Sequence, residues 1–384
     1  MSLIKKKIGI VGGGQLGKMM ILEAKRLGFY VVTMDPAPDC PSHSISDEHI
    51  IADFSDRSGY CKLAERVDVI TYEFEHINAE VLGDLEGKGH IIYPSVSGLK
   101  TIQNKYSQKM LLKDNGVPVP SFSKVSSIDE VRELGRTERF AYPMMLKTTT
   151  GGYDGKGNAL ISDEKDAEKA FVFLGGGQNE LMAEEFIDFD KEISVIACRG
   201  IDGRKVIYPV AENIHADSIL DMTVVPARIS EIAHEKASKI ADSVMEVFEG
   251  VGTFCVELFV EKNGNISVNE VAPRPHNSGH YTIEGCFANQ FENHIRGITG
   301  LPFGCVELIS PTVMVNLLGE SDGNANLTGL NEAYLEPCVH VHFYGKRESK
   351  AGRKMGHFTV VDKTIDGAIE KAKLTKNVVR IVGE

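Results

Sequence analysis

Short apolar runs alternate with helix-like segments over the N-terminal quarter of the chain. The runs are KIGIV, YVVTMD, HIIAD, DVITYE and HIIYP. Between the first two, apolar side chains recur every three or four residues, at Leu16, Met19, Met20, Ala24 and Leu27. This period predicts an amphipathic helix. Because buried strands separated by helices are typical of parallel sheets, the pattern predicts a doubly wound α/β domain.

The pattern changes after a helix that ends at Gly116 and a stiff connector, VPVP. Residues 121–198 mix short strands with a helix that begins at the capping box SIDE, which predicts a small α+β unit of the size of a lid. Two predicted hairpins follow, on either side of a long helix at residues 231–249. The stretch VHVHFYGKRESKAGRKMGHFTVV is β-rich and basic, and a helix and a strand end the chain.

Composition and charge narrow the classes of function. A chain of 384 residues is long enough for two or three domains. Its 42 basic and 54 acidic residues give a net charge of −12, which argues against nucleic acid as a partner but allows a local phosphate pocket. The seven cysteines are scattered without a CxxC pair, as in a reduced cytoplasmic protein. The chain has no long apolar run, so we expect neither a signal peptide nor a membrane span.

The segment TFCVELFVEKNGNISVNEV predicts a β-hairpin that brings two carboxylates face to face. Asn-Gly at 263–264 indicates a two-residue type I′ turn, because both central residues of that turn need positive φ. Such a turn pairs Phe259 with Val268 and, further along, Glu257 with Glu270. Like charges in opposed positions are unfavourable unless a cation lies between them, and carboxylate oxygens suit Mg²⁺. A chance surface pair, or a slip of register by one residue, is the alternative.

The N-terminal string GIVGGGQLG carries Gly12, Gly14 and Gly17 at the spacing G-x-G-x-x-G, and Asp35 ends the next strand. This spacing predicts a tight turn from strand to helix, with the helix N-terminus facing an anion. By itself the motif favours a dinucleotide-binding oxidoreductase, with Asp35 on the ribose. Asp35 also fits a structural acid at the end of a strand before Pro36.

A second glycine-rich stretch, LKTTTGGYDGKGN, follows a predicted strand. Lys147 ends that strand, and Lys156 lies among the glycines. Backbone N–H groups in such turns form anion sites, and lysines add positive charge. The Walker A string is absent, and a flexible hairpin tip is the alternative. Because this loop occurs together with the carboxylate hairpin, the combination favours a nucleotide with Mg²⁺ at its phosphates.

Five segments together resemble the ATP-grasp superfamily: GGGQLGKM, GGYDGKG, EEFI, NEVAPRPHNSGH and GKRESKAGRKMGHF. They span nearly the whole chain, and more narrowly they resemble the 5-(carboxyamino)imidazole ribonucleotide synthetases of purine biosynthesis. The resemblance implies a mixed α/β and α+β fold. It comprises a Rossmann-like pre-ATP-grasp domain at 1–104, a two-lobed ATP-grasp domain at 105–305 whose lid is 121–198, and a small β-rich C-terminal domain at 306–384.

The resemblance also implies a reaction. ATP, with Mg²⁺ or Mn²⁺, phosphorylates bicarbonate, and the resulting carboxyphosphate delivers carbon dioxide to the amine of 5-aminoimidazole ribonucleotide. The products are 5-(carboxyamino)imidazole ribonucleotide, ADP and phosphate. Members of this family are commonly dimers, so a cytoplasmic homodimer is expected.

The functional residues implied by the resemblance fall into four groups. The metal ligands are Glu257 and Glu270. The ATP site consists of Lys105, Lys147, Gly152, Tyr153, Asp154, Gly155, Lys156, Gly157, Asn158, Glu184, Glu185, Phe186, Ile187, Glu192, His215, Asn269 and Glu270. The catalytic group is Arg274, His276, Asn277 and Glu73. The substrate is bound by Gln15, Leu16, Glu73, Tyr153, Asp154, Lys346, Arg353 and Lys354.

Other interpretations remain open at this point. A dehydrogenase explains the first glycine motif but leaves the carboxylate hairpin and RPHNSGH without a role. Another ATP-grasp ligase, such as the formate-dependent glycinamide ribonucleotide transformylase or a biotin-carboxylase-like enzyme, would keep the ATP site and change the acceptor. A nucleotide sensor would bind ATP without turnover. Taken alone, the basic residues 346–354 fit a solvated loop, and RPHN fits a turn stiffened by its prolines.

Overall fold

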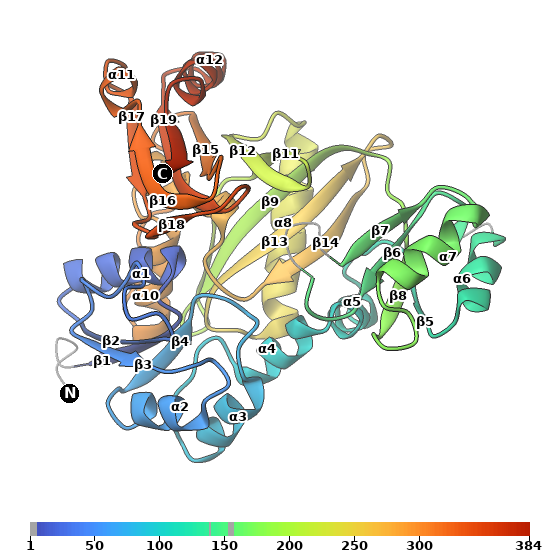
Figure 1. Cartoon of the computed structure of the whole chain (residues 1–384), viewed down its shortest axis with the longest axis horizontal. Coiled ribbons are helices and arrows are strands. Elements are labelled where there is room, and N and C mark those ends of the chain that lie inside the picture. Colours follow the sequence, from blue (N-terminus) through green and yellow to red (C-terminus); the bar gives the residue numbers. More distant parts are fainter. Residues whose placement is uncertain (1–5, 138–139, 153–156) are drawn as a thin grey trace.

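A computed structural model of the chain describes residues 6–137, 140–152 and 157–384. The N-terminal part of the protein is a parallel sheet between helices (Figure 1). The sheet has the order β3-β2-β1-β4, and its strands are β1 (Lys7–Val11), β2 (Tyr30–Asp35), β3 (Glu48–Ile51) and β4 (Val69–Tyr72). One face packs on α1 (Gln15–Arg26) and α10 (Gln290–Thr299), and the other on α2 (Arg57–Ala64) and α3 (Ala79–Gly87). The predicted doubly wound parallel domain is confirmed.

The run HIIYP is an exception to the predicted strands. It joins the sheet at Ile92, through a single parallel bridge to Ile70. Pro94 follows closely and has no N–H with which to continue the ladder. The chain leaves the sheet there and continues into α4 (Val96–Gln103).

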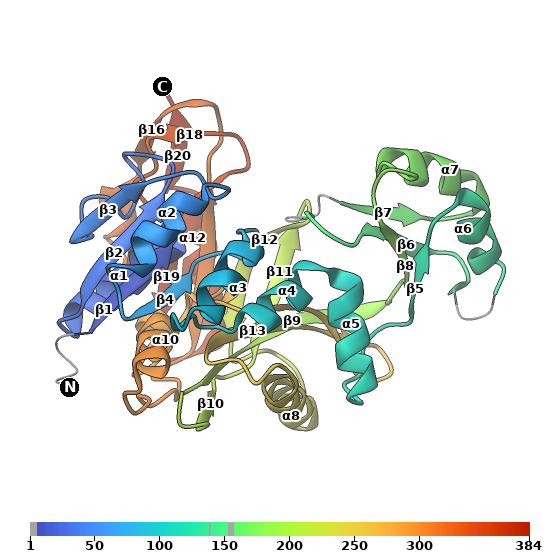
Figure 2. The ribbon, with the colours of Figure 1, turned by 90° about the horizontal axis from the view of Figure 1, so that it is seen from below.

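A smaller unit follows α5 (Lys105–Asp114) and stands to one side of the rest of the protein (Figure 2). It is an antiparallel sheet of order β5-β8-β6-β7, against which two helices pack. Its elements are β5 (Phe122–Val125), α6 (Ile128–Gly135), β6 (Met144–Thr148), β7 (Asn158–Ile161), α7 (Glu164–Phe173) and β8 (Leu181–Glu185). These are the strands and helices expected of the lid, although the predicted range 121–198 also includes most of β9, which belongs to the next sheet.

One large sheet joins the centre of the protein to its C-terminal part, in the order β14-β13-β9-β11-β12-β15-β19-β17 with β10 beside β9. Its strands are β9 (Phe189–Arg199), β10 (Lys205–Ile207), β11 (Ala211–Ala216), β12 (Ile219–Val225), β13 (Gly252–Glu261), β14 (Ile266–Ala272), β15 (Thr312–Leu318), β17 (Val339–Phe343) and β19 (Lys354–Val361). Because β12 pairs with β15, the sheet continues across the boundary predicted at 305/306.

The remaining elements cover this sheet and complete the C-terminal part. They are α8 (Glu231–Phe248), η3 (Asn277–Gly279), α9 (Thr282–Gly285), β16 (Gly323–Thr328), α11 (Leu330–Ala333), β18 (Glu348–Ser349), α12 (Ile365–Lys376) and β20 (Arg380–Gly383). The apolar face of α8 packs on β9, β13 and β14 in the largest core of the protein. Within the described residues, every helix is too short or too polar to cross a bilayer.

The turn between β13 and β14 differs from the predicted one. Gly264 has a positive φ of 83°, but Asn263 does not, so the turn is not type I′. The amide of Glu261 instead donates to the carbonyl of Asn265 at 2.9 Å, which closes a three-residue loop. Three-residue loops that end in a left-handed glycine are a common alternative for the same sequence signal.

A second irregularity restores the predicted carboxylate pair. The longer loop shifts the register, so that Phe259 faces Ser267 and not Val268 as we expected. A β-bulge beyond Phe259 then shifts the register back, and Glu257 lies directly opposite Glu270. The prediction of opposed carboxylates is therefore confirmed, although the turn chosen to support it was wrong.

Two helical glycines give a matched test of the first turn. A Cβ atom at Gly17 would clash with the backbone carbonyl of Gly12, whereas a Cβ atom at Gly87 would meet nothing within 4 Å. We expect Gly17→Ala to lower the free energy of unfolding by about 2 kcal/mol or more. Gly87→Ala should leave it unchanged or raise it by up to about 1 kcal/mol. Urea unfolding of both variants measures the difference, and equal stabilities would contradict the close packing of α1 on β1.

Candidate active site

A buried carboxylate between two lysines joins the lid to the central sheet. The Nζ atom of Lys147 on β6 lies 2.7 Å from Oε1 of Glu184 on β8, and Nζ of Lys109 on α5 lies 2.9 Å from Oε2. Burial raises the pKa of Glu184, but the two ammonium groups outweigh burial and lower that pKa to about 2. Glu184 is therefore ionised at neutral pH and holds both lysines in place.

Lys109 is a residue that the sequence analysis missed. Its Nζ atom also donates to the backbone carbonyl of Asn269 at 3.0 Å, so this one side chain connects α5, β8 and β14. Burial lowers the pKa of Lys109, and Lys147 acts in the same direction against the attraction of Glu184. A signal was present: Lys109 lies three residues before Leu112 on the buried face of its helix, where a lysine needs an anionic partner.

The opposed carboxylates lie next to this cluster. The Nζ atom of Lys105, in the first turn of α5, lies 3.1 Å from Oε2 of Glu270. Burial, and then the charge of Glu270, raise the pKa of Glu257 to about 7. The bulge leaves Asn269 and Glu270 both half-buried at this edge. Two carboxylates in register, one of which resists ionisation, are a donor set that fits a hard divalent cation such as Mg²⁺.

His276 faces the same carboxylates from the segment after β14. Its Nε2 atom lies 3.5 Å from Oε1 of Glu257. The amide of Ser278 donates to Nδ1 at 3.3 Å, so Nε2 carries the proton of the neutral ring and points it at Glu257. Burial, with Arg274 and Lys354 nearby, lowers the pKa of His276 well below its usual value. The 3.5 Å contact with Glu257 is therefore made by a neutral imidazole and is not an ion pair.

Arg274 and Asn277, predicted to bind an anion with His276, have protein partners. Arg274 donates from Nε to Glu75 at 2.5 Å and from Nη2 at 3.1 Å, and this bidentate pair joins the N-terminal domain to the central one. The amide of Asn277 exchanges hydrogen bonds of 2.9 and 2.6 Å with that of Asn316 on β15. Both side chains connect domains, and their predicted anion contact stays a prediction.

The N-terminal glycine motif binds side chains of its own domain. Glu73, at the end of β4, accepts the amides of Gly14 at 2.6 Å and Gly17 at 2.7 Å. Asp35 accepts the amide of Gly13 at 2.8 Å and is buried. These bonds use the donors that a dinucleotide pyrophosphate would need and place Asp35 in a structural role. The dinucleotide interpretation is therefore not supported by the geometry.

Charges from the C-terminal domain reach the same region. The positive charge of Lys346 lowers the pKa of Glu73, although burial raises it overall, and Lys354 acts on Glu257 and His276. Lys346 also donates to the carbonyl of Lys354 at 2.7 Å. The basic C-terminal residues therefore act electrostatically on Glu73, beside the glycine motif, and on His276 of the RPHN segment.

The other predicted residues fall into three groups. His215 and Glu192 form a close ion-pair contact on adjacent strands. Glu185 accepts the amide of Ser121 at 3.2 Å, and Arg353 donates to the carbonyl of Glu348 at 3.0 Å. Gln15, Gly157, Asn158 and Ile187 are half-buried, Phe186 is exposed, and Gly152 and Leu16 are buried. Tyr153, Asp154, Gly155 and Lys156 lie outside the described residues.

Three domain families match the chain in succession. The ribonucleotide synthetase preATP-grasp domain matches residues 5–103. The ATP-grasp domain matches residues 110–291, and the phosphoribosylaminoimidazole carboxylase C-terminal domain matches residues 312–371. The order of these domains is the one that the resemblance implied.

Whole proteins match over nearly their full lengths. The N5-carboxyaminoimidazole ribonucleotide synthase of Bacillus subtilis (strain 168) is 40% identical over 365 residues, which cover 95% of this chain and 93% of that protein. The synthetase from Thermotoga maritima superposes with a TM-score of 0.90 at 46% identity, over 99% of this chain and 100% of that one. The synthase from Aspergillus clavatus, solved with ADP and 5-aminoimidazole ribonucleotide, gives 0.90 at 32% identity, over 98% and 99%.

The buried lysine gives a prediction for stability. Lys109→Met removes one of the two cations on Glu184 and leaves that carboxylate undercompensated. Breaking a buried pair costs about 3 kcal/mol or more, so the free energy of unfolding should fall by that amount. Lys113→Met, on the same helix but exposed, should change it by less than about 1 kcal/mol. Calorimetry or urea unfolding compares the two variants. Equal losses of unfolding free energy would contradict a stabilising role of the Lys109 contacts.

The Arg274–Glu75 pair gives a prediction for pH. Burial raises the pKa of Glu75, but Arg274 lowers it from 4.5 to about 2 in the folded protein. Because the pKa of Glu75 is lower in the folded protein than in the unfolded chain, the ionised carboxylate stabilises the fold above pH 4.5. This stabilisation is lost as the pH falls from 4.5 to about 2. At neutral pH, Glu75→Gln should therefore lower the free energy of unfolding by about 3 kcal/mol, and this difference should shrink as the pH drops through that window.

Urea unfolding of the wild type and the variant at a series of pH values measures this difference. Glu86→Gln, at an exposed position on α3, is the control and should show almost no difference at any pH. A Glu75→Gln difference that stays constant down to low pH would contradict the ion pair.

Proposed function

The chain belongs to the N5-carboxyaminoimidazole ribonucleotide synthases, and we propose that it carboxylates 5-aminoimidazole ribonucleotide with ATP and bicarbonate. It is an ATP-grasp ligase, and the product of the reaction is N5-carboxyaminoimidazole ribonucleotide, an intermediate of purine biosynthesis. One observation carries the proposal most strongly: the opposed Glu257–Glu270 pair lies beside Lys105 in a chain whose relative binds both ADP and the aminoimidazole ribonucleotide.

We propose that ATP lies between the lid and the large sheet. Lys105 and Lys147 would meet its phosphates, because both ammonium groups are held by carboxylates at the base of the lid. Glu257 and Glu270 would hold Mg²⁺, or Mn²⁺ in its place. When bound, the cation supplies positive charge to the phosphates, which is a main lever in phosphoryl transfer. The segment 184–187 leads out of β8 towards the large sheet and would meet the adenine.

The substrate would occupy the space between the glycine motif, the RPHN segment and the basic C-terminal residues. Lys346, Arg353 and Lys354 would bind the ribonucleotide phosphate, and Glu73 would orient the amine. Glu73 suits that role because two amides hold its carboxylate rigidly at a helix N-terminus. His276, held by Ser278, would orient bicarbonate beside the cation.

Carboxyphosphate reacts with water, so the reaction needs a site that excludes solvent. The lid stands apart as its own sheet and is anchored by buried pairs at β6 and β8. We propose that it closes over the phosphates as in other lid-gated enzymes. The C-terminal domain match favours this reaction over formate-dependent transformylation. A cytoplasmic homodimer is part of the proposal, and seven free thiols fit a reducing compartment.

Bicarbonate-dependent ADP formation tests the assignment. With ATP, Mg²⁺ and bicarbonate, we expect ADP release to be strongly stimulated by 5-aminoimidazole ribonucleotide and to stop when a chelator removes the metal. Glu270→Gln should lower kcat by about 100-fold or more, because it removes one of the two metal carboxylates.

Glu261→Gln, at a half-buried position at the end of the same hairpin, is the control and should keep the wild-type rate. Stimulation by glycinamide ribonucleotide with formate, and not by the aminoimidazole ribonucleotide, would transfer the chain to the other ligase class. No stimulation by either acceptor would refute the proposed activity.

A further inference from the structure

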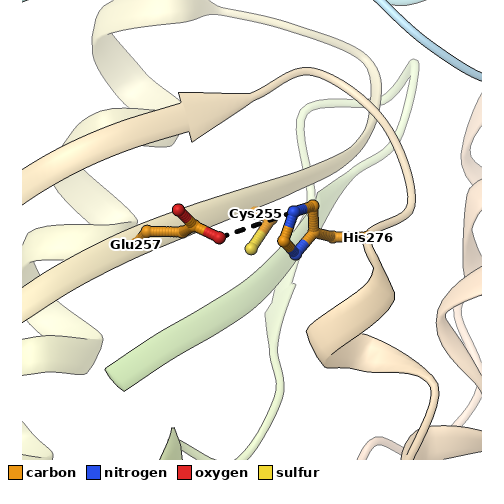
Figure 3. Close-up of side chains that lie close together, drawn as sticks. All are labelled: Cys255, Glu257 and His276. Carbon is orange, nitrogen blue, oxygen red and sulfur yellow. Dashed lines mark ion pairs between the residues drawn. The ribbon is translucent and has the colours of Figure 1, made fainter. Parts of the chain in front are cut away.

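Cys255, Glu257 and His276 carry three different donor atoms and lie close together (Figure 3). Cys255 precedes Glu257 by two residues on β13, so both point to the same face of the sheet. His276 reaches them from the segment after β14. A sulfur, a carboxylate oxygen and an imidazole nitrogen, one from each residue, lie within 4.8 Å of one another. Among the described residues, this is the single group of three or more such side chains with that geometry.

The donor set differs from that of the carboxylate pair. Mg²⁺ takes oxygen ligands, whereas a thiolate and an imidazole select softer cations such as Zn²⁺. Around Zn²⁺, bonds of about 2.0–2.3 Å place tetrahedral ligand atoms roughly 3–4 Å apart. Because the atoms here lie up to 4.8 Å apart, they need to move together by roughly 2 Å at most, which changes of side-chain torsion supply.

We propose that Cys255, Glu257 and His276 form a binding site for a thiophilic divalent cation, with Zn²⁺ as its best fit, and that filling this site inhibits the enzyme. The inhibition follows from sharing: Glu257 belongs both to this site and to the proposed magnesium pair, so Zn²⁺ and a Mg²⁺–nucleotide complex exclude each other. The inhibition rests on the proposed function, whereas the binding of Zn²⁺ does not.

The surroundings of the three residues support binding. Cys255 is fully buried at the inner end, whereas the side chains of Glu257 and His276 keep 32% and 18% of their surface exposed, so a cation can enter from their side. The fourth position of a tetrahedral ion would face that opening and hold water. The charge of Arg274, which lies close by, is compensated by its bidentate pair with Glu75.

Ser278 provides the outer support that a metal-bound histidine requires. Its Oγ atom lies 2.9 Å from Nδ1 of His276 and 3.6 Å from the sulfur of Cys255. When a cation takes the lone pair of Nε2, the ring proton moves to Nδ1 and is donated to Oγ, and the 3.3 Å hydrogen bond from the Ser278 amide to Nδ1 is given up. The thiol loses its proton to solvent as the sulfur–metal bond forms, and a protonated Glu257 carboxyl does the same, so the binding of a cation releases protons.

Cobalt(II) tests the site by spectroscopy, independently of any activity. We expect the wild-type protein, without nucleotide, to bind Co²⁺ with visible tetrahedral bands and a near-ultraviolet thiolate charge-transfer band, and Zn²⁺ to displace it. Cys255→Ala should lose the charge-transfer band and bind Zn²⁺ about 100-fold more weakly. Cys255→Ser serves the same purpose if the alanine variant does not fold. Cys198→Ala, an equally buried cysteine on the adjacent strand β9, should behave as the wild type.

Inhibition is measured as the zinc concentration that halves each variant's own rate of Mg²⁺-dependent ADP formation. This half-inhibiting zinc concentration should be about 100-fold higher in Cys255→Ala and unchanged in Cys198→Ala. In the wild type it should rise with the concentration of Mg²⁺–ATP. A charge-transfer band that persists in Cys255→Ala, or equal Zn²⁺ affinities of that variant and the wild type, would overturn the site. If the chain shows no ligase activity, the cobalt spectra still decide whether the site exists.

Discussion

The active site depends on two carboxylates that backbone pairing holds opposite each other. Glu257 and Glu270 are fixed by the ladder of β13 and β14, whose strands are covered on one side by α8. The ladder fixes the two Cα atoms opposite each other, so only changes of side-chain torsion can separate the carboxylates. The unfavourable free energy of holding two carboxylates together is reflected in the pKa of Glu257, which burial and the charge of Glu270 raise to about 7. Lys105 of α5 compensates part of this negative charge, and the proposed cation would compensate the rest.

The hydrophobic pattern was sufficient for most of the fold, because strands and helices bury different periodic sets of side chains. It failed where a single residue alters the backbone. The loop before Asn265 has three residues rather than two, and a bulge near Leu258 cancels the resulting shift. No periodic signal distinguishes these two compensating changes from an unbroken hairpin. The prediction therefore reached the right pair through the wrong register.

The sequence named candidate residues for the site but not their partners in the structure. Resemblance identified Arg274 and Asn277, yet Glu75 and Asn316, which bind them, lie far away in the sequence. Lys109 was missed because a lysine on a helix is usually a solvated residue, and its buried partners come from two other elements. Contacts of this kind form when domains pack, and the sequence of a single chain carries no trace of them.

The glycine motif at the first turn determines how this domain could be redesigned. Glu73 and Asp35 fill the cradle in which a Rossmann fold would place a cofactor's phosphates. The protein thus supplies its own permanent anion, built into the chain and always present. The glycine spacing that elsewhere indicates a binding site for a diffusible ligand here forms a site that acidic side chains of the same domain already occupy. Redesigning this domain to accept a dinucleotide would have to begin with removal of the acids, since the glycines are already in place.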